Sequence, residues 1–185
     1  EETARLTRMI NEVLDLKKIE QGKIELHAAK TDLHALAKSV VEQLRIRPNQ
    51  PNYQVRFEEE KLYAFVDEDK VKQIFINLLS NSAKYTPPEK TVTIEGFSVL
   101  RAVVVNIRDE GPGIPKELWE KLFHPFARAN DAIAQKTVGS GLGLAIVKSL
   151  VETMGGKVRA ENLSTGAQFT VVLPRGEIDE RINAA

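Results

Sequence analysis

A first group of side chains with chemical potential lies between residues 77 and 85. The spacing of Asn77, Asn81 and Lys84 places all three on one face of a helix. Asparagine is a poor helix former, because its amide competes for backbone hydrogen bonds, so two of them one turn apart indicate a function. An amide oxygen suits Mg²⁺, which takes oxygen ligands and keeps waters beside phosphate oxygens. Lys84 offers a positive charge for phosphate and Tyr85 a ring for a base, although a polar helix face without function remains an alternative.

A second group follows an apolar run, residues 103–107, that is typical of a buried strand. It consists of Asp109, Gly111 and Gly113. A carboxylate at a strand end can accept a hydrogen bond from an exocyclic amine such as that of adenine. The glycines allow the backbone to approach a flat ring, since no Cβ stands in the way. A turn with a solvated aspartate is the alternative.

A third group, Gly139-Ser140-Gly141-Leu142-Gly143-Leu144, opens a predicted helix. Helix N-terminal amides and the helix dipole favour phosphate. The sequence of residues 132–138 does not predict the strand that a dinucleotide-binding fingerprint requires, and G-x-x-x-x-G-K-[ST] is absent. A magnesium nucleotide needs all three kinds of group, so together they predict ATP binding.

Other kinds of chemistry find little support in the sequence. The 185 residues include no cysteine, which excludes disulfides, thiolate catalysis and cysteine-ligated metal. The three histidines lack metal-ligand spacing, and Ser140 has no nucleophile-elbow context. The formal net charge is zero, so we expect no nucleic-acid partner.

No apolar run approaches the roughly 20 residues of a membrane helix. The charged N-terminus lacks both a signal-peptide layout and an initiator Met. We therefore expect an excised fragment that is cytoplasmic, with a membrane anchor elsewhere in the full-length protein left open.

Residues 1–20 differ from the rest of the chain. Leu6, Met9, Val13 and Leu16 recur at the spacing of a coiled-coil or helical-bundle seam. So short a helix is unstable alone in water, so it must pair with another helix or, alternatively, pack on its own domain. Residues 21–22, Gln-Gly, are expected to form a hinge.

From residue 23 onward, helices alternate with strands. Asp67 is expected to cap the long helix, whose core face carries Val71, Phe75, Leu78, Leu79 and Ala83. Strands are predicted at 23–26, 53–57, 63–66, 91–97, 101–107, 157–161 and 168–173, and helices at 32–45, 68–85, 115–123 and 142–154. This order predicts an α/β fold, a two-layer sandwich with a mixed sheet.

The three groups belong to a longer series that resembles sensor histidine kinases of two-component systems. The matching segments are 77–86 (N box), 109–114 (G1 box), 123–126 (F box), 139–144 (G2 box) and 165–174, the closing glycine and strand. Their order and spacing agree over roughly residues 23–175. Residues 14–22 similarly resemble the end of the second dimerisation helix.

The resemblance implies the Bergerat (GHKL) ATP-binding fold, with ATP and Mg²⁺ as cofactors. It divides the chain into a dimerisation-helix end (1–20), a hinge (21–22), a catalytic domain (23–176) with a lid at about 124–140, and a tail (177–185).

The resemblance also assigns roles by position. Asn81 is the expected Mg²⁺ ligand, Asp109 the adenine reader, and Asn77, Lys84 and Arg128 the catalytic residues. Ala127 departs from the pattern, because many members have an aromatic residue there. The full set of expected nucleotide contacts is Asn77, Asn81, Lys84, Tyr85, Asp109, Gly111, Gly113, Ile114, Arg128, Gly139, Ser140, Gly141, Leu142, Gly143, Leu144 and Thr170.

The family transfers the γ-phosphoryl group of Mg·ATP to a histidine in a His-acidic motif on the first dimerisation helix. No histidine here has that setting, so we expect ATP binding without autophosphorylation. The implied partners are the missing dimerisation hairpin and a response regulator receiver domain. The full-length protein is expected to be a homodimer, and a monomeric fragment remains open.

Two observations bear on rival activities. ATPases of this fold carry a glutamate base four residues before the metal-binding asparagine, whereas this chain has Asn77, which cannot take a proton. An anti-sigma-factor type serine kinase shares the fold, but residues 1–20 argue against it. A nucleotide-binding scaffold without transfer activity is the other alternative.

Overall fold

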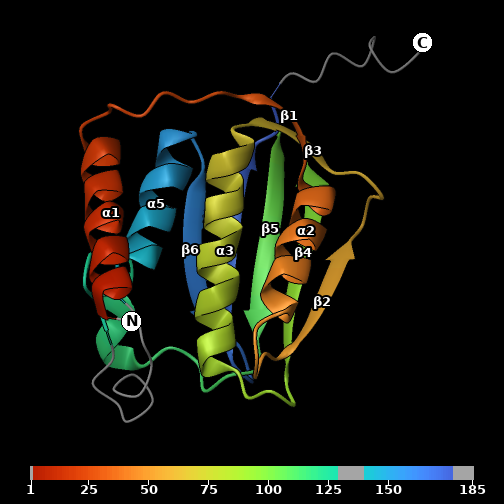
Figure 1. Ribbon diagram of the computed structural model, residues 1–185. Coiled ribbons are helices and arrows are strands. Elements are labelled where there is room, and N and C mark those ends of the chain that lie inside the picture. The colour runs from red at the N-terminus through yellow and green to blue at the C-terminus, as the bar shows by residue number, and fades with distance from the viewer. Residues whose placement is uncertain (1, 129–139, 177–185) are drawn as a thin grey trace.

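A central helix, α3 (Glu68–Tyr85), lies across one face of a five-stranded sheet in the computed structural model, which describes residues 2–128 and 140–176 (Figure 1). The strands follow the spatial order β2-β4-β5-β7-β6. Their bounds are Asn52–Phe57 (β2), Thr91–Val99 (β4), Ala102–Asp109 (β5), Ala167–Pro174 (β7) and Lys157–Asn162 (β6). The β2–β4 pair is parallel and the other pairs are antiparallel. The predicted two-layer α/β sandwich with a mixed sheet is confirmed.

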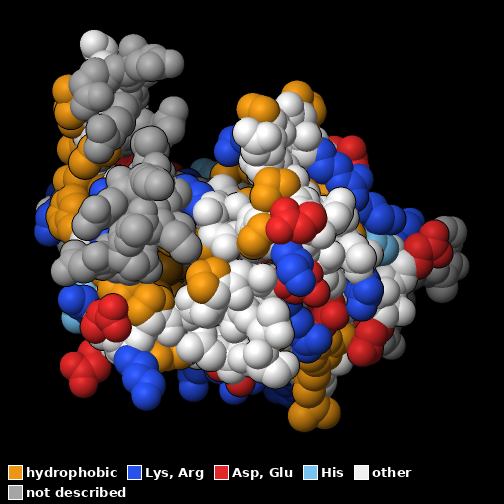
Figure 2. All heavy atoms as spheres, turned by 90° about the horizontal axis from the view of Figure 1, so that it is seen from below, with side chains coloured by type: hydrophobic (Ala, Val, Ile, Leu, Met, Phe, Trp, Pro, Cys, Tyr) orange, Lys and Arg blue, Asp and Glu red, His pale blue; other side chains and the backbone are white. Residues whose placement is uncertain are grey.

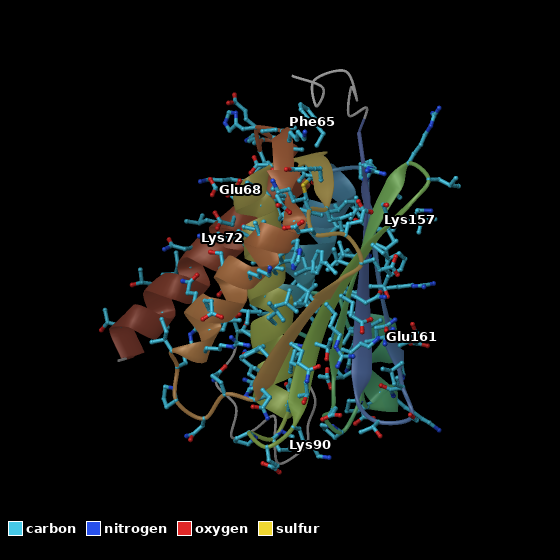
Figure 3. All side chains as sticks on the ribbon, turned by 90° about the vertical axis from the view of Figure 1, so that its right-hand side faces the viewer. Phe65, Glu68, Lys72, Lys90, Lys157 and Glu161 are labelled. Atoms are coloured by element: carbon cyan, nitrogen blue, oxygen red, sulfur yellow. The ribbon has the colours of Figure 1, made fainter. Side chains whose placement is uncertain are left out.

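The helices form the second layer. Besides α3, helix α2 (Leu33–Arg45) packs on β2, and α5 (Gly143–Thr153) packs on β6 and on α3. Seen from the side, the helices occupy one side of the sheet, and Lys157 and Glu161 mark its edge strand β6 (Figure 3). Both side chains are exposed, and charged residues of this kind protect an edge strand from further pairing.

Burial of one face fixes the orientation of α3. Five apolar side chains on this face have no exposed surface: Val71, Ile74, Phe75, Leu78 and Leu79. Each fully buried side chain of this size contributes about 1.5–3 kcal/mol relative to an exposed one. The predicted core face is confirmed, with Ala83 partly buried at its margin. The opposite face, with Asn77 and Asn81, is thereby directed away from the sheet.

Asp67 caps α3 as predicted and also holds a distant segment. Its Oδ1 accepts a hydrogen bond from the Lys70 N–H at 3.1 Å, and its Oδ2 accepts one from the His27 N–H at 2.9 Å. Burial raises the pKa of Asp67, but these two backbone N–H groups and the electrostatic attraction of the Lys70 and His27 side chains together outweigh it and bring the pKa below its ordinary value of 3.8. The ionised carboxylate therefore stabilises the fold.

Two predicted elements differ from those observed. Residues 23–26 are not a strand; the first strand is β1 (Ala29–Asp32), which pairs antiparallel with β3 (Tyr63–Val66) in a separate sheet. Residues 23–26 lie in a loop, from which Ile24 packs against the core. The helix predicted at 115–123 is a 3₁₀ helix, η1 (Lys116–Lys121), preceded by Pro115.

Helix α1 (Glu2–Glu20) packs on its own domain, against α5, which was the alternative to pairing with another helix. Leu16 is buried, whereas Leu6 at the other end of the predicted seam is 52% exposed. The helix stops before the Gln-Gly pair, where Gly22 has a φ of +64°. No helix in the described part of the chain combines the length and apolar character that crossing a bilayer requires.

The β6–β7 turn approaches the end of β5 very closely. Gly166 has a φ of +77°, and a Cβ added there would lie 1.8 Å from the Asp109 carbonyl oxygen. Only glycine fits this position, since any side chain would separate the two strands.

Replacing Asp67 by alanine should lower the free energy of unfolding by about 2 kcal/mol at neutral pH, because the helix cap and the His27 contact are both lost. The wild-type advantage should be fully present above pH 3.8 and disappear as the pH falls from there through the lower folded-state pKa. Urea denaturation over a pH series measures this. Exposed Asp69→Ala in the same helical turn is the control, and an equal loss in both variants would contradict the assigned role.

Gly166→Ala should cost more than about 3 kcal/mol, because it adds a backbone collision to an unfavourable φ. Gly155 provides a matched control, since its φ is +73° and nothing lies within 4 Å of its added Cβ. Gly155→Ala should cost only about 1 kcal/mol. Urea denaturation distinguishes the two, and similar losses would refute the close contact.

Candidate functional site

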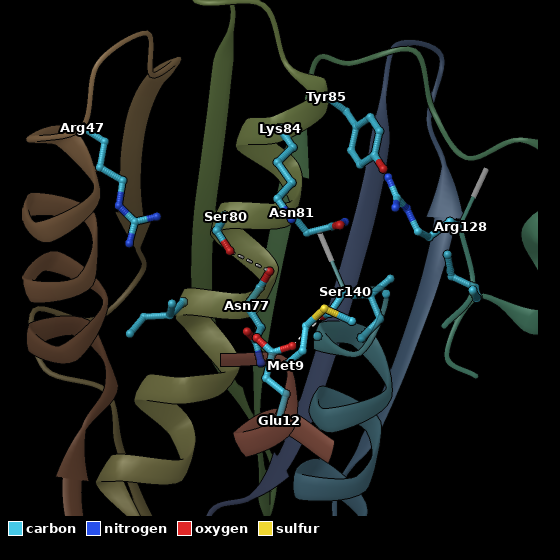
Figure 4. Close-up of a pocket in the computed structure, with 16 residues that line it drawn as sticks. Met9, Glu12, Arg47, Asn77, Ser80, Asn81, Lys84, Tyr85, Arg128 and Ser140 are labelled. Carbon is cyan, nitrogen blue, oxygen red and sulfur yellow. Dashed lines mark hydrogen bonds between the residues drawn. The ribbon is translucent and has the colours of Figure 1, made fainter. Parts of the chain in front are cut away.

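A cavity of about 760 Å³ opens on the polar face of α3 (Figure 4). Its volume lies within the range of about 300–1,000 Å³ that is usual for small-molecule sites. Elements distant in sequence surround it: α1, the segment after α2, α3, and the chain on both sides of residues 129–139. The lining residues are Met9, Glu12, Arg47, Ile76, Asn77, Ser80, Asn81, Lys84, Tyr85, Leu122, Ala127, Arg128, Ser140, Gly141, Gly143 and Leu144.

The α3 wall presents amides, a hydroxyl and an ammonium group. The Ser80 hydroxyl donates to the backbone carbonyl oxygen of Asn77 at 3.3 Å, and Asn77 itself lines the cavity. A Cβ added to Gly143 would lie 3.6 Å from the Asn77 Oδ1. The first turn of α5 therefore faces Asn77, and its backbone N–H groups are oriented as in helix N-termini that bind anions.

The glycine loop is held against the segment that ends at Arg128. Gly141 has a φ of +76°, and a Cβ there would lie 2.9 Å from the Phe126 backbone. The Phe126 N–H donates to the Gly141 carbonyl oxygen at 2.9 Å. The F box and G2 box segments of the sequence are thus in direct contact. Gly139 and most of the predicted lid lie outside the described residues.

Ser140 links the loop to α1. Its hydroxyl donates to the Glu12 Oε2 at 2.5 Å and accepts a hydrogen bond from the Leu142 N–H at 3.2 Å. The Glu12 carboxylate therefore lies at the edge of the cavity, next to the start of α5.

Asp109 lies outside the cavity lining and is 7% exposed. Its Oδ1 accepts hydrogen bonds from the N–H groups of Gly111 at 3.0 Å and Ala167 at 3.2 Å. Burial raises the pKa of this carboxyl group, and the two N–H groups and the nearby Ser82 hydroxyl offset part of the rise. The buried Ser82 hydroxyl lies beside this carboxyl group, and its side-chain interaction with Asp109 lowers the Asp109 pKa.

The structure brings nine of the predicted site residues together around the cavity: Asn77, Asn81, Lys84, Tyr85, Arg128, Ser140, Gly141, Gly143 and Leu144. The other described ones do not line it: Asp109, Gly111, Gly113, Ile114, Leu142 and Thr170. Leu142 is fully buried in the core. The Thr170 hydroxyl donates to the Asn106 Oδ1 at 2.9 Å, and the Ile114 N–H donates to the Asn162 Oδ1 at 2.7 Å.

Sequence reasoning did not identify the contributions of α1 and of the chain after α2. Met9, Glu12 and Arg47 belong to none of the predicted nucleotide-binding segments, and only the fold brings them to the cavity. Ser80 was identifiable, because it lies three residues after Asn77 on the same helix face.

The cavity concentrates positive charge on an otherwise mixed surface. Its charged lining residues are Arg47, Lys84, Arg128 and one carboxylate, Glu12. On the face seen from below, by contrast, the basic and acidic side chains of the described residues are interspersed (Figure 2). No group of three or more His, Cys, Asp or Glu that could hold a metal occurs within residues 2–128 and 140–176. A metal here would need oxygen ligands from a bound molecule, and the arrangement suits a polyanion such as a polyphosphate.

Comparisons with known proteins find relatives among histidine kinases. A hybrid signal transduction histidine kinase D of Dictyostelium discoideum is 34% identical over 179 residues; the match covers 91% of this chain and 11% of that protein. The chain thus spans a small part of the length of this curated relative.

Two solved structures share the fold. Full-length ShkA in complex with AMPPNP has a TM-score of 0.79 and 27% identity, covering 91% of this chain and 35% of ShkA. Histidine kinase ThkA in complex with the response regulator protein TrrA has a TM-score of 0.71 and 27% identity, covering 94% of this chain and 49% of that one.

The sequence profile of one family, described as histidine kinase-, DNA gyrase B-, and HSP90-like ATPase, matches residues 66–177. This segment runs from the last residue of β3 past the end of β7 and includes α3, Asp109 and the glycine loop. The chain therefore belongs to the family of histidine kinase-, DNA gyrase B- and HSP90-like ATPases.

Proposed function

We propose that this chain binds Mg·ATP in the α3 cavity and is the catalytic domain of a sensor histidine kinase. The observation that carries the proposal is that α3 presents Asn77, Asn81 and Lys84 to one cavity whose far wall is the glycine loop opening α5. The histidine kinase relatives and the AMPPNP complex of ShkA support it.

The base end of the nucleotide is assigned to Asp109. Within the described residues, both backbone hydrogen bonds to this carboxylate go to Oδ1, and the buried Ser82 hydroxyl lies close enough to lower the Asp109 pKa. An amino group of the nucleotide base that donates to Asp109 or Ser82 would use hydrogen-bonding capacity that these buried groups retain. The backbone is also close here, because a Cβ on Gly111 would lie 2.9 Å from the Tyr85 carbonyl oxygen.

The phosphate end is assigned to the cations of the cavity and to the start of α5. Lys84 and Arg128 match phosphate charge, and the N–H groups near Gly143 match phosphate oxygens. Asn81 would offer an amide oxygen to Mg²⁺, which prefers oxygen ligands. When bound, the ion would neutralise phosphate charge.

The residues present favour transfer to a protein side chain over hydrolysis. Asn77 cannot remove a proton from water. The position that carries the general base in ATPases of this fold therefore cannot act as a base here. Phosphoryl transfer demands mainly orientation and charge stabilisation, which these side chains can supply. We infer that the acceptor is a histidine of a dimerisation hairpin outside these 185 residues and that a response regulator receives the group next, as the ThkA–TrrA complex suggests. We also propose that this domain acts in the cytoplasm.

Asp109→Asn should weaken Mg·ATP binding by about 1–3 kcal/mol, because an amide in this position presents a donor to the adenine amine. Isothermal titration calorimetry with ATP and GTP measures the effect. ATP should lose affinity and GTP should not, and exposed Asp69→Asn should change neither. An equal loss for both nucleotides would remove Asp109 as the base reader.

Transfer itself is tested by mixing the chain with a separately prepared phosphoacceptor hairpin and γ-labelled Mg·ATP. The label should appear on the hairpin histidine as an acid-labile, base-stable phosphoramidate, and a hairpin whose histidine is replaced by alanine is the control. Nucleotide binding without any transfer would instead support a scaffold.

A further inference from the structure

Asn162, the last residue of β6, is not among the predicted site residues, yet its side chain bonds to another segment of the chain. Its Oδ1 accepts a hydrogen bond from the Ile114 N–H at 2.7 Å, and its Nδ2 donates to the Ile114 carbonyl oxygen at 3.0 Å. One carboxamide thus pairs with both backbone groups of a single residue, as a neighbouring β-strand would. Ile114 ends the turn that begins at Asp109, so Asn162 holds the far end of that turn.

The β6–β7 hairpin closes without these two bonds. Asn162 already pairs with Ala167 across the hairpin, and the Leu163 N–H donates to the Gly166 carbonyl oxygen at 3.0 Å. Residue 162 is also exposed, so its side chain contributes little to the core. The structural effect of the carboxamide is therefore concentrated on the 109–114 turn.

The same hairpin also holds the near end of the 109–114 turn. The Ala167 N–H donates to the Asp109 Oδ1 at 3.2 Å, and Gly166 lies directly against the Asp109 carbonyl oxygen. Since Asn162 and Ala167 are paired residues of the two strands, one rigid unit positions both ends of the turn. The Asp109 end uses backbone groups, whereas the Ile114 end depends on one side chain.

The middle of the turn has little to hold it. Within the described part of the chain, residues 111–113 form no hydrogen bond between backbone groups. Gly113 has a φ of +81°, and a Cβ added there would lie 3.0 Å from the Asn162 Oδ1. Glycine loses more conformational freedom than any other residue when its backbone is fixed. The contact with Asn162 therefore replaces order that the turn does not supply itself.

A nucleotide base that packs on this turn needs the turn in one conformation. Without Asn162, the turn would have to be ordered when the base binds, and that ordering would lower the affinity. Asp109 would keep its bond to Ala167, so the carboxylate itself would stay in place. We propose that Asn162 is a positioning residue for base recognition, which fixes the glycine turn beside Asp109 and thereby strengthens the preference for adenine.

This inference rests on the proposed nucleotide site, and calorimetry with two nucleotides separates the two. In the presence of Mg²⁺, Asn162→Ala should bind ATP about fivefold more weakly than wild type and GTP within about twofold, because guanine lacks the amine that Asp109 reads. The matched control is Asn52→Ala, an exposed asparagine at the start of the other edge strand, β2. It should change neither affinity.

Amide hydrogen exchange followed by NMR provides a second measurement on the same variant. The Ile114 N–H should exchange about tenfold faster in Asn162→Ala than in wild type, because its acceptor is lost. The Ala167 N–H, which bonds to Asp109, should exchange at an unchanged rate.

Equal losses for ATP and GTP, or no loss for either, would overturn the role of Asn162. Faster exchange at both Ile114 and Ala167 would show a general loosening of the hairpin and would also overturn it. Failure of the wild-type chain to bind ATP would contradict the proposed function itself.

Discussion

Burial of the apolar face of α3 is the constraint on which the site depends. Ile74, Leu78 and Leu79 have no exposed surface, so the helix cannot rotate about its axis without exposing them to water. Asn77 and Asn81 share the same helix and are therefore held on the far side, facing the cavity. The positions of these amides therefore follow from hydrophobic packing.

Two close backbone contacts position the rest of the site around this helix. Gly141 lies against Phe126, which brings the start of α5 to the α3 amides. Gly166 lies against Asp109, which places the carboxylate where Gly111 and Ala167 donate to it. Glycine is required at both contacts for steric reasons, so the glycine motifs of the sequence correspond to contacts between segments as well as to loop conformation.

Sequence reasoning was most accurate where local chemistry decides the structure. The Asp67 cap and the core face of α3 depend on residues within one or two turns, and both were predicted. The strand expected at 23–26 was wrong, because these residues form a loop from which Ile24 packs against the core. Arg47 and Glu12 could not be predicted, since only the packing of α1 and α2 beside α3 brings them to the cavity. The position of Asp109 outside the cavity lining likewise could not be predicted, because it depends on the contact between Gly166 of the β6–β7 turn and the end of β5.

The central claim is that one ligand spans the α3 amides, the Asp109 turn and the glycine loop. An amide NMR titration of the uniformly labelled chain with Mg·AMPPNP tests it most directly. The resonances of Asn81, Gly111 and Gly141 should shift together and saturate at one ligand per chain. Shifts confined to residues outside these three segments, or separate saturation curves for them, would contradict the account.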